Sequence, residues 1–93
     1  MKSAAIATRE LQRALERYLA VRPELGKQFN EAMKAAFADI AAYPDRYPVV
    51  LGTARQYLVD GFPYSVISRF RAGRITIVAV YHHSRKPYGW RRR

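Results

Sequence analysis

The side chains best suited to chemistry gather in the last third of the chain, and they are arginines, histidines and tyrosines. Arg69 precedes a long apolar run, His82 and His83 end that run, and Arg85 and Tyr88 follow it. Guanidinium groups stabilise developing negative charge, and imidazole exchanges protons near neutral pH. These residue types therefore favour an anionic partner or substrate.

The chain of 93 residues contains no cysteine. This excludes disulfides, thiolate nucleophiles and thiolate metal sites, and it is compatible with a reducing cytoplasm. His82 and His83 have no neighbouring Asp, Glu or Cys, so the sequence predicts neither a metal site nor a cofactor. No apolar run approaches the roughly 20 residues of a membrane span, and residues 1–7 do not form a secretory signal. We therefore expect a soluble cytoplasmic protein without a membrane partner.

The charge balance points to a polyanionic partner. Lysine and arginine number 17 against 7 aspartates and glutamates, a formal net charge of +10. Such a field attracts nucleic acid, an acidic protein segment or an anionic membrane surface, and a neutralising partner relieves its self-repulsion. A hydrophobic fraction of 49% still supports a packed core, so we expect one globular domain over residues 1–93.

Two helices are expected to position this region. Residues 8–21 repeat apolar side chains at three- and four-residue spacing, and a second apolar stripe runs from Leu25 to Ile40. Pro23 suits the first turn of the second helix, and Pro44 disfavours helical geometry at Tyr43. The short link between the two predicts an antiparallel helical hairpin.

Three strands are expected after Gly52, in residues 53–60, 62–71 and 74–82. Ala72 and Gly73 have the length of a two-residue hairpin turn, which pairs Arg71 with Arg74. Counting outward, one face carries these pairs: Phe70 with Ile75, Ser68 with Ile77, Val66 with Ala79, and Tyr64 with Tyr81. The other pairs Arg69 with Thr76, Ile67 with Val78, and Ser65 with Val80.

The fold class is therefore α+β, with the helical hairpin packed on a small antiparallel sheet. The first face, led by Val66, Phe70, Ile75 and Ile77, is expected to be core. The second is apolar in its middle and basic at the turn, where Arg69, Arg71 and Arg74 gather, and we expect Arg55 to join them.

Together with the order of two helices and three strands, two sequence motifs resemble those of the RelE/ParE toxin superfamily of bacterial type II toxin–antitoxin modules. They are Phe62-Pro63-Tyr64 and residues 79–90, Ala-Val-Tyr-His-His-Ser-Arg-Lys-Pro-Tyr-Gly-Trp. The resemblance covers residues 8 to 90 and is closest to the ParE-like, plasmid-stabilisation branch. Members usually begin with a clear strand, which the alanine-rich residues 2–7 would shorten or remove.

The resemblance implies a growth-inhibiting toxin with a cognate antitoxin that carries an acidic, amphipathic segment. The ParE-like branch implies action on DNA gyrase through an interaction surface. The partner- or nucleic-acid-binding candidates are Arg55, Arg69, Arg71, Arg74, Arg85 and Trp90. The RelE-like alternative is a ribosome-dependent, metal-independent mRNA endonuclease with Arg69, His83, Arg85 and Tyr88 as catalytic candidates. Against this alternative, residues 53–60 contain no lysine, unlike the lysine-rich patch associated with RelE.

Each candidate also has a structural explanation. Arg69, Arg71 and Arg74 alone would form a solvated hairpin tip, while His82 and His83 would cap a strand. Tyr88 and Trp90 would pin the tail by packing. A further alternative is a non-toxic, basic nucleic-acid-binding module.

Overall fold

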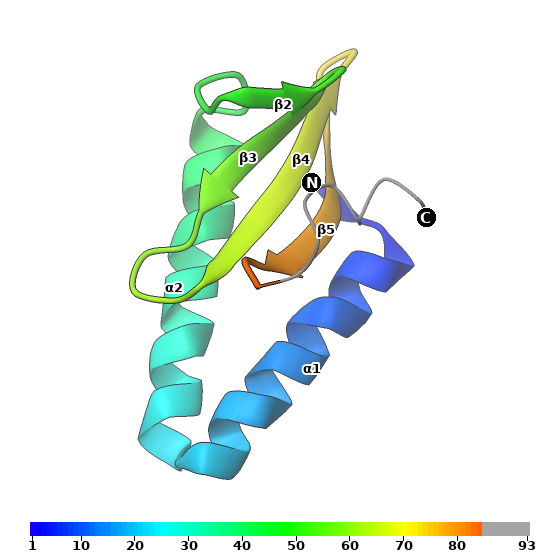
Figure 1. The fold of residues 1–93 in the computed structure, drawn as a ribbon. Coiled ribbons are helices and arrows are strands. Elements are labelled where there is room, and N and C mark those ends of the chain that lie inside the picture. Colours follow the sequence, from blue (N-terminus) through cyan, green and yellow to red (C-terminus); the bar gives the residue numbers. More distant parts are fainter. Residues whose placement is uncertain (85–93) are drawn as a thin grey trace.

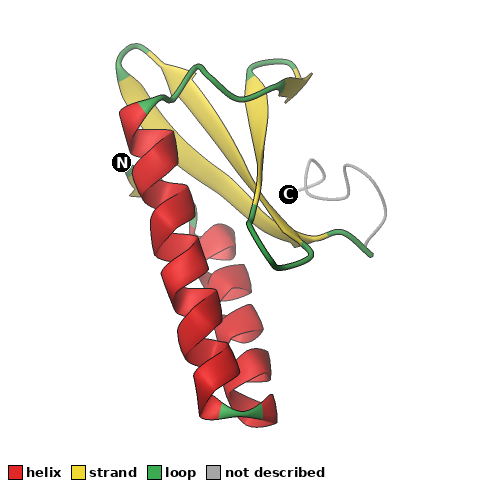
Figure 2. Cartoon of the chain, turned by 90° about the vertical axis from the view of Figure 1, so that its left-hand side faces the viewer, coloured by secondary structure: helices red, strands yellow, loops and turns green. Residues whose placement is uncertain are grey.

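A computed structural model describes residues 1–84 of the chain. Two antiparallel helices, α1 (Ala5–Val21) and α2 (Pro23–Ala42), cover one face of a five-stranded sheet (Figures 1 and 2). The strands are β1 (Lys2–Ser3), β2 (Val49–Leu51), β3 (Ala54–Leu58), β4 (Tyr64–Arg71) and β5 (Arg74–His82), in the spatial order β1-β5-β4-β3-β2. The predicted α+β fold and the three-stranded meander of β3, β4 and β5 are confirmed.

The helical hairpin turns within one residue. Arg22 takes extended geometry between the helices, and Pro23 occupies the first turn of α2 as expected. Close packing at this end depends on Gly26, because a Cβ added there would lie 2.5 Å from Leu19 Cγ and 3.1 Å from Leu19 Cα. Within residues 1–84, neither helix combines the length and apolar character that crossing a membrane requires.

Two short strands complete the sheet at its edges. β1 pairs in parallel with β5, with Lys2 beside Thr76 and Ser3 beside Ile77, so the N-terminal strand is present in shortened form. β2 pairs with the start of β3 and was not predicted. Its three residues are too few to show a strand periodicity.

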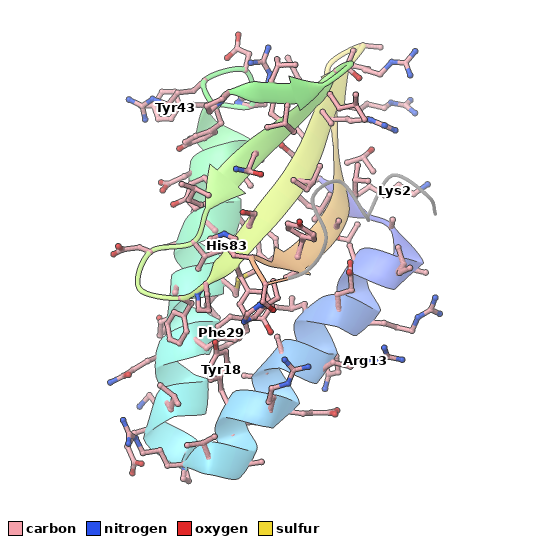
Figure 3. The ribbon with its side chains drawn as sticks, viewed as in Figure 1. Lys2, Arg13, Tyr18, Phe29, Tyr43 and His83 are labelled. Atoms are coloured by element: carbon pink, nitrogen blue, oxygen red, sulfur yellow. The ribbon has the colours of Figure 1, made fainter. Side chains whose placement is uncertain are left out.

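The main core lies between the helices and the sheet. Tyr18, Phe29, Phe62 and Tyr64 form an aromatic cluster there, with ring centroids 4.9 to 6.3 Å apart. Figure 3 shows Tyr18 and Phe29 next to each other. Two residues of the Phe62-Pro63-Tyr64 phrase thus act as a packing anchor beneath the helical hairpin.

The predicted register holds near the hairpin turn and fails beyond it. Arg71 pairs with Arg74, Arg69 with Thr76 and Ser68 with Ile77, but Ile67 then pairs with Ala79 because Val78 is an extra residue in β5. This β-bulge moves every later side chain of β5 to the opposite face. The four pairings expected beyond Ser68 were therefore wrong. Ile67 pairs with Ala79, Val66 with Val80, Ser65 with Tyr81, and Tyr64 with His82.

The bulge changes which residues are core. Val80 is buried on the helix side, whereas Ala79 and Tyr81 join Ala54 and Ile67 in a smaller cluster on the other face. The backbone N–H of Val80 donates to Glu10 Oε1 of α1 at 3.1 Å, so a helix carboxylate pairs the strand beyond the end of β1. Phe70 was expected in the core, but it is 38% exposed near the hairpin tip.

Candidate functional site

The hairpin of β4 and β5 carries three arginines on the face that the helices leave uncovered. Arg71 is paired with Arg74 and Arg69 with Thr76, and residues two apart in a strand share a face. With Val78, these four side chains line a shallow groove of about 360 Å³. The structure thus places Arg69, Arg71 and Arg74 together, as the hairpin register predicted.

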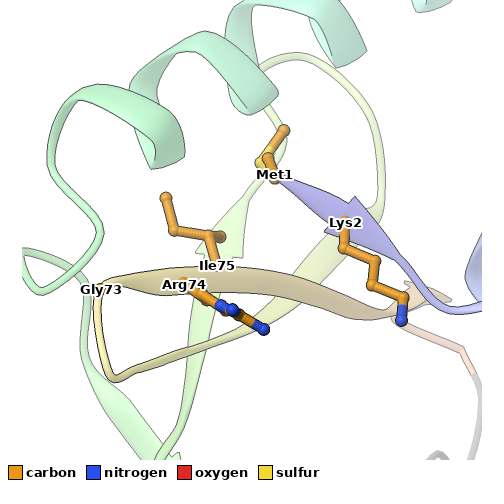
Figure 4. Close-up of a pocket in the computed structure, with 5 residues that line it drawn as sticks. All are labelled: Met1, Lys2, Gly73, Arg74 and Ile75. Carbon is orange, nitrogen blue, oxygen red and sulfur yellow. The ribbon is translucent and has the colours of Figure 1, made fainter.

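A fourth cation comes from the opposite end of the sequence. Lys2 lies beside Thr76 because β1 pairs in parallel with β5. Figure 4 shows Lys2 and Arg74 on one side of the sheet, with Met1 and Ile75 on the other. We call Lys2, Arg69, Arg71 and Arg74 the basic strip. Sequence patterning missed Lys2, because only the pairing of β1 with β5 brings it to the hairpin.

The cations of the basic strip form no ion pair with the carboxylates of residues 1–84. All four side chains belong to exposed residues. The one ion pair within that part of the chain joins Lys34 and Glu31 on α2. Four uncompensated cations on adjacent strands favour an anionic partner.

Arg55 lies on the other face, which corrects the expectation that it joins the basic residues. In the β3–β4 register Ala54 is opposite Arg69, and Arg55 is opposite Ser68. A shift of one residue reverses the face of a side chain, and the connection between β3 and β4 was too long to set that register from sequence. Arg55 instead donates from its guanidinium to the carbonyl oxygen of Tyr47 at 2.8 Å.

The histidines lie at the far end of the same hairpin. His83 Nε2 is 2.8 Å from Oγ of buried Ser65, and the His83 backbone N–H donates to the carbonyl of Pro63. His82 Nδ1 accepts a bond from the backbone N–H of Ser84, and its ring stands edge-on to Tyr64. Both imidazoles thus tie the end of β5 to the start of β4.

His83 and Arg69 are not brought together in the described part of the chain. His83 bonds to Ser65, which is four residues from Arg69 along β4, or about 13 Å of strand. Ile67 lies between them on that face. The remaining candidates, Arg85, Tyr88 and Trp90, lie outside the described residues.

A second surface groove, not anticipated from sequence, flanks β3. It has a volume of about 380 Å³ and is lined by Tyr47, Pro48, Gln56, Tyr57 and Leu58. Tyr57 Oη donates to Asp39 Oδ2 at 2.7 Å. Burial, followed by this hydrogen bond, raises the pKa of Tyr57 to about 12 because both favour the neutral phenol.

Comparisons with known proteins agree with the fold. A family model described as the ParE toxin of type II toxin–antitoxin system, parDE, matches residues 4–87. Among solved structures, a chain of the chromosomal ParDE system from P. aeruginosa is similar with a TM-score of 0.65 and 14% identity, covering 87% of this chain and 91% of that chain. At 14% identity this similarity shows the fold. A search of curated proteins found no match. Because the family model spans most of its length, the chain belongs to the ParE toxin family of type II toxin–antitoxin systems.

Proposed function

We propose that this protein is a growth-inhibiting toxin that acts in the cytoplasm by binding DNA gyrase, and that a cognate antitoxin neutralises it. The observation that carries the proposal is the match of residues 4–87 to the ParE toxin family. Poisoning an enzyme by binding requires an accessible surface rather than an active site. The exposed basic strip, which forms no ion pair within residues 1–84, is consistent with that requirement.

The separation of Arg69 from His83, the two catalytic candidates in the described residues, supports binding over RNA cleavage. A metal-independent nuclease site needs a proton-transferring group and a charge-stabilising arginine at one phosphodiester. Here His83 is bonded to Ser65, about 13 Å of strand from Arg69. Of the four catalytic candidates, the two that lie in the described residues, His83 and Arg69, therefore do not share one site.

A supercoiling assay with purified gyrase tests the proposal. We expect the folded toxin to inhibit supercoiling or accumulate cleaved DNA–gyrase complexes, and the purified antitoxin complex to do neither. Phe29→Ala removes a buried ring from the core without altering the basic strip, so it tests whether inhibition depends on the folded protein and should inhibit less. Full supercoiling without cleaved complexes at saturating folded toxin would sink the proposal.

The mRNA alternative has a separate readout. Expression of the chain should arrest growth while messages, followed by primer extension, remain uncut. New cuts in translated messages together with unaffected gyrase would support the endonuclease instead. Normal growth at verified expression of folded protein would contradict both toxin mechanisms and favour a non-toxic nucleic-acid-binding module.

The antitoxin should contact the toxin through an acidic, amphipathic segment. Its charge complements the net charge of +10, and its apolar side suits the sheet or the helical hairpin. Co-expression should restore growth and raise the yield of soluble toxin. The combined change Arg69→Glu, Arg71→Glu and Arg74→Glu tests the sheet-face version, since an unchanged complex would place the interface elsewhere.

A further inference from the structure

The basic strip is a regular array of charges on three adjacent strands. Lys2 lies on β1, Arg74 on β5, and Arg69 with Arg71 on β4. Side chains two residues apart on one strand are separated by about 6.6 Å, and neighbouring strands by about 4.8 Å. The four cations therefore form a continuous charged area that is larger than the contact area of a single ion pair.

The chemistry of this surface suits phosphate. Arginine presents a planar fork of N–H donors that binds phosphate oxygens bidentately, and lysine adds a mobile point charge. The hydroxyl of Thr76 lies in the same groove and can donate a further hydrogen bond. Since no described carboxylate forms an ion pair with the strip, a phosphate does not have to displace one.

The composition of the groove separates a nucleic-acid backbone from other anions. An amphipathic acidic peptide needs apolar contacts beside its charges, and Val78 is the sole aliphatic residue among the described lining residues, so an antitoxin segment on this face would have to extend beyond the groove. Single-stranded nucleic acid is usually held by aromatic side chains on which bases stack, and none of those lining residues is aromatic. A duplex presents its phosphates outward and requires neither feature.

We propose that the basic strip is a binding surface for the phosphate backbone of double-stranded DNA. Binding there is independent of base sequence, because contacts to phosphates position a protein without reading bases. This contact is additional to the proposed binding of the gyrase protein. It gives the toxin its own contact with DNA, the substrate on which gyrase works.

Salt dependence is the physical signature of this contact. Each phosphate neutralised by a cation releases counterions and contributes about −0.9 to the slope of log K against log salt concentration. Replacing one strip arginine by glutamine should therefore lower the magnitude of the slope by about 1. The loss of affinity should be similar for unrelated DNA sequences.

The test measures binding of the full chain to a fluorescently labelled DNA duplex by anisotropy across a salt series. The strip variant combines Arg69→Gln, Arg71→Gln and Arg74→Gln. Its matched control combines Arg9→Gln, Arg13→Gln and Lys27→Gln, which removes the same charge from exposed positions on the helices. Lys2→Gln tests the contribution of β1 separately, and circular dichroism verifies that each variant is folded.

We expect the strip variant to lose at least about thirtyfold in affinity and about 3 from the slope, with a much smaller loss in the control. Lys2→Gln alone should lower the slope by about 1. Equal losses in strip and control variants would show an effect of net charge and overturn the proposal. Tighter binding of an RNA duplex, a single strand or an acidic peptide than of the DNA duplex would overturn it too. No gyrase is present, so this result and the supercoiling result can fail independently.

Discussion

The two faces of the sheet differ in what surrounds their side chains: one packs against the helices, and the other is left uncovered by them. The helix-side face of β4 and β5 contributes Val66, Ile77 and Val80 to the main core. The opposite face has a smaller apolar cluster around Ile67 and, toward the hairpin tip, the basic strip. Because side chains alternate along a strand, one residue can stabilise the core while the next is available to contact a partner on the opposite face. Changes on the two faces should therefore separate into effects on folding and effects on binding.

The largest expected effect is on the helix side. Phe29→Ala removes a fully buried ring that contacts Tyr18, Phe62 and Tyr64, and it should lower the free energy of unfolding by about 3–5 kcal/mol. Urea denaturation measures this loss. Arg71→Ala on the opposite face is the control and should stay within about 0.5 kcal/mol of the parent. Similar losses in both variants would remove the distinction between the faces.

A smaller loss is expected where the two helices approach each other. Gly26→Val places a branched side chain against Leu19, whose Cα would lie 3.1 Å from the new Cβ, and should cost about 2 kcal/mol. Thermal unfolding measures this cost. Adding Leu19→Ala should recover part of it by making room. An unchanged midpoint in the single variant would show that the helices are not closely packed there.

Tyr57→Phe removes the hydrogen bond to Asp39 at the edge of the helix-side face. It should lower the free energy of unfolding by about 1 kcal/mol. The pKa of Tyr57 is about 12 in the folded protein and 10.0 for an ordinary tyrosine. The folded state thus holds this proton more tightly, and the resulting stabilisation is complete below pH 10 and is lost as the pH rises toward 12.

Ultraviolet titration of the tyrosines should show that Tyr57→Phe lacks a phenol ionising near pH 12. Tyr43→Phe, at an exposed position, is the matched control and should retain that late phase. Loss of a phenol that ionises near pH 10 in Tyr57→Phe, with the late phase retained, would contradict the bond to Asp39.

The smallest expected effect lies at the tip beside the basic strip and is stabilising. Ala72 and Gly73 have φ angles of 50° and 75°, as in the type I′ turn, where asparagine is favoured at the first position. Ala72→Asn should add about 0.5–1 kcal/mol and raise the melting temperature by about 4 °C. Ala72→Val, with a branched side chain at positive φ, should lower it. A melting temperature ordered the other way would contradict this turn geometry.

The helices, the hairpin turn and the first pairs beyond it could be predicted from sequence, because each depends on local signals. Pro23 and Pro44 mark the bounds of α2, and a two-residue turn pairs Arg71 with Arg74. The bulge at Val78 had no local signal, so the faces of Val80 and Tyr81 were assigned wrongly. Arg55 was misplaced for a related reason, since the register of β3 depends on its pairing with β4.

The amino-acid sequence by itself determined the charge, the helical hairpin, the family resemblance and the gathering of Arg69, Arg71 and Arg74 at one turn. Tertiary structure alone decided that Lys2 joins them, that Arg55 does not, and that His83 bonds to Ser65 away from Arg69. The physical reason is the distance along the sequence between the residues that interact. Periodicity and turn length act over a few residues, whereas a site assembled across strands depends on pairings between segments as distant as Lys2 and Thr76.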